Sequence, residues 1–129
     1  MVKATLAIAA FLVAASTSAL ADSLVWNVTE EGASGIKGAQ GQWFVNIDGG
    51  NKISGTANMQ LDTGAILTYT IDGSIKESVY TVNLSKRTDG KSGCVWSGHS
   101  PAHEDQKSHG LIGKVVCDGK GEFFLRAGF

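Results

Sequence analysis

Apolar and polar residues alternate along most of the chain, and clusters of glycine, asparagine and aspartate interrupt the alternation at intervals. In the segment 65–71, Leu67, Tyr69 and Ile71 alternate with two threonines. This period of two is typical of a β-strand with one face packed and one face in water. No segment has the 3.6-residue period of an amphipathic helix. The pattern therefore predicts an all-β fold.

The same pattern predicts eight strands. Their expected ranges are 24–28, 42–47, 52–60, 65–71, 78–84, 93–98, 111–117 and 122–126. Between them we expect a glycine-rich polar loop over 29–41 that contains Glu30, a turn at Asp72–Gly73–Ser74, and a solvated connection over 85–91. Many short strands must close or pack face to face to bury their apolar sides. We expect a small antiparallel barrel of about eight strands, with a two-sheet β-sandwich as the alternative.

The two cysteines, Cys94 and Cys117, allow one intramolecular disulfide. If they face each other in an antiparallel pair, Trp96 faces Val115, and one side of this ribbon is wholly apolar. The pairing and the hydrophobic pattern agree, so we expect residues 98–111 to form a long hairpin loop. Closing a loop of this length stabilises a small domain by about 3 kcal/mol in the chain-entropy model.

The beginning of the chain has the features of a secretory signal peptide. Lys3 precedes the apolar segment 4–15, and the small residues of Ala19-Leu20-Ala21 match a cleavage site. We therefore expect residues 1–21 to be a cleaved signal peptide of bacterial type and residues 22–129 to be a single β domain. The expected location is periplasmic or secreted, where the disulfide would be stable.

The charge balance excludes some partners. Cleavage after residue 21 leaves 108 residues with 10 basic and 12 acidic side chains. A nearly neutral chain of this kind lacks the basic surface that binds nucleic acids or anionic membranes. No later segment is apolar over the roughly 20 residues that a membrane span needs, so we expect neither a nucleic-acid partner nor a membrane span.

All three histidines lie within one short segment, His99, His103 and His109, which we call the histidine loop. Glu104 and Asp105 lie between them. Imidazoles that a loop can gather suit zinc or copper. The spacing matches no named metal motif, so the alternative is a solvated loop without a metal.

Catalytic motifs are missing from the sequence. It has no G-x-S-x-G nucleophile turn and no phosphate-binding G-K-[ST] ending. The adjacent carboxylates Glu30-Glu31 and Glu104-Asp105 fall in expected loops, and no acid–base pair is marked out. We therefore expect that the protein is not an enzyme.

The aromatic residues leave two possibilities open: they fill the core, or they line a hollow barrel that holds one small ligand. Gly41-Gln42-Trp43 at the start of an early strand, with Arg126 in the last one, resembles the calycin group of lipocalins, avidins and small secreted bacterial protease inhibitors. The resemblance implies a small barrel that binds small ligands or inhibits proteins and catalyses no reaction. Phe44-Val45 and Gly49-Gly50-Asn51 depart from the avidin pattern, so no biotin site is expected.

Together these features predict an exported, non-catalytic binding domain for a small ligand or a protein partner, with inhibition among its roles. One alternative is a periplasmic metal-binding or pH-responsive protein that uses the histidine loop. Another is a structural or surface component that self-associates through its sheet edges.

Overall fold

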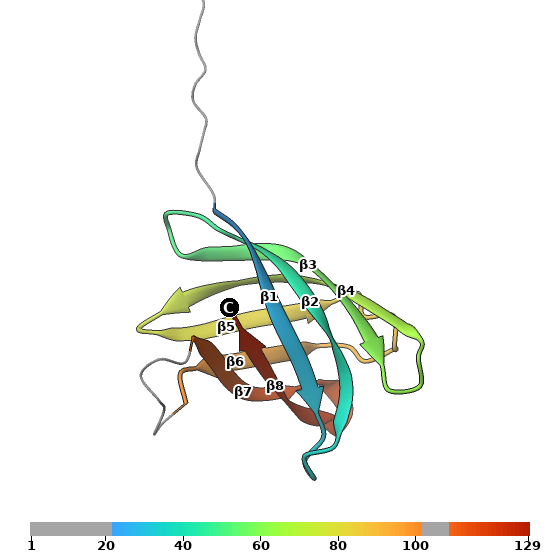
Figure 1. Cartoon of the computed structure of the whole chain (residues 1–129). Coiled ribbons are helices and arrows are strands. Elements are labelled where there is room, and N and C mark those ends of the chain that lie inside the picture. The colour runs from blue at the N-terminus through green and yellow to red at the C-terminus, as the bar shows by residue number, and fades with distance from the viewer. Residues whose placement is uncertain (1–21, 102–108) are drawn as a thin grey trace, which may run out of the picture.

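The computed structural model describes residues 22–101 and 109–129, which form a closed antiparallel β-barrel (Figure 1). Each strand pairs with the next, and β8 pairs with β1 to close the barrel. The strands are β1 (Asp22–Glu31), β2 (Lys37–Ile47), β3 (Lys52–Leu61), β4 (Ile66–Lys76), β5 (Val79–Ser85), β6 (Cys94–His99), β7 (Gly110–Val116) and β8 (Glu122–Gly128). The expectation of an eight-stranded barrel is confirmed, and the sandwich alternative is wrong.

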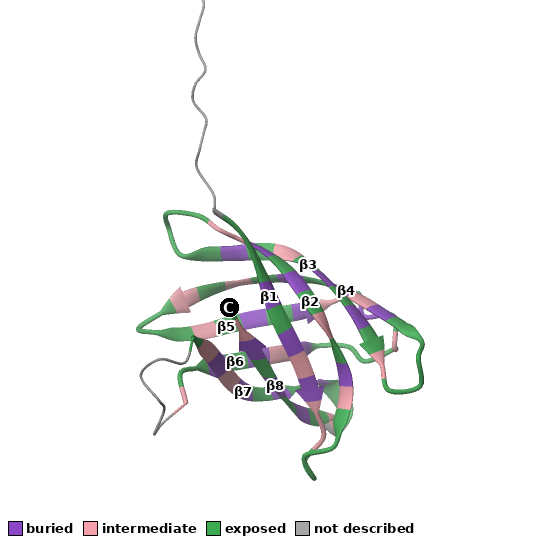
Figure 2. Cartoon of the chain, viewed as in Figure 1, coloured by how far each residue is buried: buried purple, intermediate pink, exposed green. Residues whose placement is uncertain are grey.

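Burial alternates along the strands as the sequence pattern predicts (Figure 2). In β4, for example, Leu67, Tyr69 and Ile71 point into the barrel and are nearly inaccessible to solvent. The one helical element among the described residues is the short 3-10 turn Asp118–Lys120, between β7 and β8. No helix in this described part is long and apolar enough to cross a membrane.

The disulfide and its expected register are confirmed. Cys94 at the start of β6 is bonded to Cys117, directly after β7. Trp96 pairs with Val115, as the predicted register requires. The bond therefore fastens the beginning of β6 to the end of β7.

The expected turn at Asp72–Ser74 is wrong, because β4 continues to Lys76 and the chain turns at Glu77 and Ser78. Both turn residues have positive φ angles, 52° and 68°, as a tight two-residue hairpin turn requires. Gly73 instead lies within the strand, where a Cβ would collide with the carbonyl oxygen of Thr81 on β5. This glycine allows two strands to approach closely, which is its other common role in sheets.

The loop expected over 29–41 is also wrong in its bounds. β1 extends to Glu31 and β2 begins at Lys37, so a short connection of five residues remains. The pairs Thr29 with Gln40 and Glu30 with Ala39 continue the ladder into this segment. Glycines in the segment concealed the strand period from sequence analysis.

Candidate ligand-binding surface

The centre of the barrel is filled by aromatic side chains. Trp43 and Trp96 are fully buried, with ring centroids 5.4 Å apart and nearly perpendicular planes. Trp26 stacks on Trp43 at 6.1 Å. The indole N–H of Trp43 donates to the Tyr69 hydroxyl at 2.9 Å, and that of Trp96 donates to the Leu125 carbonyl at 3.2 Å. A ligand in the centre would have to displace these rings, so the geometry favours a filled core.

One end of the barrel is closed by a buried ion-pair network. Arg87, in the connection after β5, makes two hydrogen bonds to the Glu30 carboxylate, at 3.0 and 3.1 Å. The Tyr69 hydroxyl donates to the same carboxylate at 2.7 Å. Arg87 also donates to Asp89 at 2.7 and 3.1 Å, and its guanidinium lies over the Tyr69 and Phe123 rings. The expectation that Glu30 and Arg87 lie in solvated loops is therefore wrong.

The electrostatics of this network hold Arg87 and Asp89 in their ionised forms. Burial tends to raise the pKa of Asp89, but the hydrogen bond from Arg87 outweighs it and lowers that pKa to about 2. Burial tends to lower the pKa of Arg87, and its bonds to Asp89 and Glu30 raise it instead. Burial and the neighbouring Glu30 charge raise the pKa of Tyr69, which stays a neutral donor. The buried polar atoms of the network all have hydrogen-bond partners, so the network closes this end of the barrel and offers no reactive group.

The opposite end of the barrel is covered by Phe129, whose ring stacks on Trp26 with 5.0 Å between centroids. A hollow of about 400 Å³ opens beside it, lined in part by Ile75, Tyr80 and Leu111. Phe129 thus contacts both this mouth of the barrel and the buried ring of Trp26.

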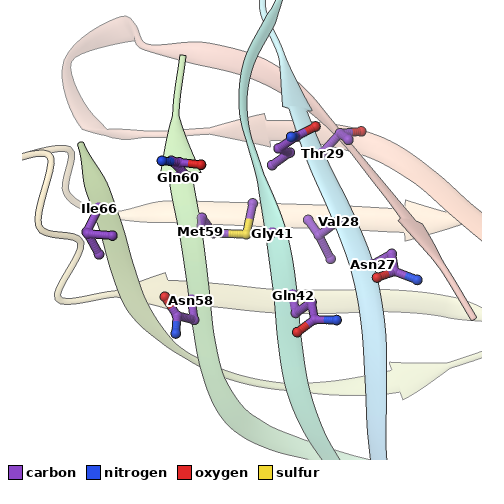
Figure 3. Close-up of a pocket in the computed structure, with 10 residues that line it drawn as sticks. Asn27, Val28, Thr29, Gly41, Gln42, Asn58, Met59, Gln60 and Ile66 are labelled. Atoms are coloured by element: carbon purple, nitrogen blue, oxygen red, sulfur yellow. The ribbon is translucent and has the colours of Figure 1, made fainter. Parts of the chain in front are cut away.

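The outer face of β1, β2 and β3 carries two rows of uncharged polar side chains (Figure 3). Paired positions on the three strands define each row. The Gln42 row consists of Asn27, Gln42 and Asn58, and the Gln40 row consists of Thr29, Gln40 and Gln60. We call the two rows together the amide face.

A shallow hollow of about 650 Å³ lies over the amide face. Its floor is the backbone at Gly41, between the two rows, where Val28 and Met59 turn their side chains inward. A Cβ on Gly41 would collide with the Asn58 carbonyl and the Met59 backbone. Glycine is therefore required here for β2 and β3 to approach so closely. Because all three positions face inward, the floor of the hollow is bare backbone.

The amides of the Gln42 row are exposed, and within the described residues none of them hydrogen-bonds another protein group. In the Gln40 row, Gln40 accepts a bond from Lys37 at 2.9 Å and Gln60 donates to the Gly64 carbonyl at 3.3 Å. A primary amide offers two donor hydrogens and an acceptor oxygen. The Gln42 row therefore presents donors and acceptors that remain available to a ligand.

Apolar groups border the amide face, and two basic side chains lie next to it: Lys37, which bonds to the neutral Gln40, and Arg126, which is paired with Glu31. Phe44 follows Gln42 by two residues on the same side of β2 and is 42% exposed, and Ile66 on β4 is 65% exposed. Arg126 on β8 pairs with Thr29 across the strands, and its guanidinium bonds to Glu31 at 3.1 Å. None of the residues that line the hollow carries a charge.

The sequence alone does not reveal this surface. The signal was present, since Asn27, Gln40, Gln42, Asn58 and Gln60 all occupy the polar positions of alternating strands. Amides at such positions are ordinary for a solvent-exposed face, and only the strand register brings them into rows.

The histidine loop lies only partly within the described residues. His99 ends β6, where its Nδ1 lies 2.9 Å from the Ser100 carbonyl oxygen, and His109 immediately precedes β7. His103 lies outside the described residues. Among those described, no three histidine, cysteine or acidic side chains gather as a metal site would require. Zinc or copper binding by this loop stays a prediction.

No protein-family model, curated protein or solved structure matches the chain. The closed eight-stranded antiparallel barrel is consistent with a small calycin-like barrel. Arg126, part of that resemblance, lies on the outer face with 55% of its side chain exposed. Trp43, another part of it, is buried and packs against Tyr69 and Trp96. The agreement with the resemblance is therefore one of barrel architecture.

Proposed function

We propose that the protein is a non-catalytic domain that binds an uncharged carbohydrate on its amide face. The observation that carries this proposal is the Gln42 row, three exposed amides in register over an uncharged hollow. Sugar hydroxyls donate and accept hydrogen bonds, as primary amides do. The exported location predicted from the sequence is where polysaccharides are encountered.

Other classes of ligand suit this surface less well. Phosphates and carboxylates are bound mainly by arginine and lysine, and the hollow has neither. Small apolar ligands need enclosed apolar pockets, whereas this hollow is shallow and polar. Protein interfaces depend on buried tryptophan, tyrosine and arginine anchors, none of which lines the hollow.

The rest of the molecule supports a binding role without catalysis. The buried carboxylate of Glu30 is committed to Arg87 and Tyr69, so it is not free to move protons. Every strand of the closed barrel has a partner on both sides, and strand-end segments such as 22–26 of β1 and 66–69 of β4 have a partner on one side only. Edges this short give little support to self-association through edges as a function.

Native gel electrophoresis through soluble neutral polysaccharides tests the proposal. β-Glucan, xyloglucan, galactomannan and dextran are each included in a separate gel. We expect at least one to slow the purified protein. Asn58→Asp should abolish the retardation, because it places a negative charge in the neutral hollow. Asn83→Asp, the same change on the outer face of β5, should preserve it. If no polysaccharide slows the protein, or if both variants behave like the wild type, the proposal is wrong.

A further inference from the structure

The register of the amide face restricts the shape of its ligand. Asn27 pairs with Gln42, and Gln42 pairs with Asn58, so the Gln42 row runs straight across three neighbouring strands. Neighbouring strands are about 4.8 Å apart, and residues two apart on one strand are about 7 Å apart. The hydrogen-bonding groups therefore repeat along a line perpendicular to the strands, with the open floor at Gly41 between the rows.

This repeat matches one kind of glycan. In β-1,4-linked chains of pyranose sugars the chain is extended and flat, and each sugar advances by close to one strand spacing. Hydroxyl groups project from both edges of such a ribbon. α-1,4-Linked chains coil, so their hydroxyl groups do not stay in line over three strands.

We propose that the amide face binds a linear, uncharged, β-1,4-linked glycan that lies across β1, β2 and β3 with one sugar over each strand. This inference rests on the proposed carbohydrate-binding function. The ribbon edges meet the Gln42 row on one side and the Gln40 row on the other. Ile66 lines the hollow next to β3 and offers apolar contact to a sugar there, and Phe44 lies just outside the Gln42 row.

The inference sets the length of ligand that binds best. Three strands carry the rows, and the next strand offers Ile66 and Thr68 at the paired positions rather than amides. Affinity should therefore rise with each sugar up to about three, one for each strand spacing, and then level off. If each sugar adds one net hydrogen bond, each step up to that length strengthens binding by about fivefold.

Calorimetric titration with neutral oligosaccharides of one to six sugars tests the inference. The β-1,4-linked series are those of glucose, N-acetylglucosamine, mannose and xylose, and maltooligosaccharides are the α-linked control. In at least one β-linked series we expect the affinity to rise with chain length and to level off at three or four sugars. Maltotetraose should bind at least tenfold more weakly than the tetrasaccharide of that series. Asn27→Ala removes the amide on β1, so the affinity of this variant should stop rising at two sugars. Asn83→Ala on β5 should change nothing.

The outcomes separate this inference from the proposed function. If a monosaccharide binds as tightly as its tetrasaccharide, or if maltotetraose binds as well as the β-linked chains, the surface binds carbohydrate but not in the inferred way. If Asn27→Ala and Asn83→Ala have equal effects, the line across the strands is wrong. If none of the saccharides binds at millimolar concentration and no polysaccharide retards the protein, the proposed function fails as well.

Discussion

Replacing Arg87 by methionine should strongly destabilise the barrel. The Arg87 side chain is 1% exposed and makes two hydrogen bonds to Glu30, whose side chain is 7% exposed. Methionine has a similar length but no charge, so the variant leaves the Glu30 carboxylate buried without its counter-charge. Removing one partner of a buried ion pair costs about 3–5 kcal/mol. That is a large share of the roughly 5–15 kcal/mol by which small domains are stable.

The chain offers a matched control at the neighbouring glutamate. Arg126 bonds to Glu31 at 3.1 Å, but the Arg126 side chain is 55% exposed. Arg126→Met should therefore lower the free energy of unfolding by no more than about 1 kcal/mol. Both variants exchange the same residue types and break a pair with adjacent residues of β1. They differ in that Arg87 is buried and also bonds to Asp89, whereas Arg126 is exposed and bonds to Glu31 alone.

Urea unfolding followed by the fluorescence of the buried tryptophans measures both variants. If Arg87→Met is too unstable to fold, the double variant that also carries Glu30→Gln is measured instead. It removes both charges of the Arg87–Glu30 pair and should recover part of the lost free energy of unfolding. Equal losses for Arg87→Met and Arg126→Met would refute the reasoning, as would a double variant that is less stable than Arg87→Met alone.

Three further predictions concern the close approach of β4 and β5, acid stability and metal binding. Gly73→Ala should cost about 1–3 kcal/mol in urea unfolding because of its collision with β5, whereas Gly49→Ala, in open space, should be neutral; equal effects would contradict the close approach. The pKa of Asp89 falls from 3.8 to about 2 on folding, so its stabilisation is full above pH 4 and is lost as the pH falls to about 2. Asp89→Asn should flatten that part of the stability profile, and an unchanged slope would exclude the ion pair as its source. Calorimetric binding of zinc or copper should disappear when the histidine loop loses its three histidines, and binding that persists would place any metal elsewhere.

The strands were predictable because burial imposes a period of two on the sequence. β5 and β6 match their expected ranges to within one residue at each end. The disulfide register followed from Cys94 and Cys117, because one pairing fixes the alignment of both strands. These features depend on local alternation and one cross-link, which a single sequence contains.

The errors arose where a residue type has two structural roles. The sequence pattern places Gly73 in a turn, but this glycine permits close strand approach. It places Glu30 and Arg87 in solvated loops, because nothing in the sequence reveals that two charges 57 positions apart neutralise each other inside the barrel. The amide face escaped sequence analysis for the same reason, since its rows exist only after β1, β2 and β3 are placed in register.

The most direct test of carbohydrate binding on the amide face is a nuclear magnetic resonance titration of the isotope-labelled protein with the four β-1,4-linked tetrasaccharides of glucose, N-acetylglucosamine, mannose and xylose. The side-chain NH₂ groups of Asn27, Gln42 and Asn58 give their own signals. Our account predicts that these signals shift together with the backbone of Gly41 when at least one of these sugars is added. Shifts confined to the mouth around Phe129, or no shifts with any of the four sugars, would contradict it.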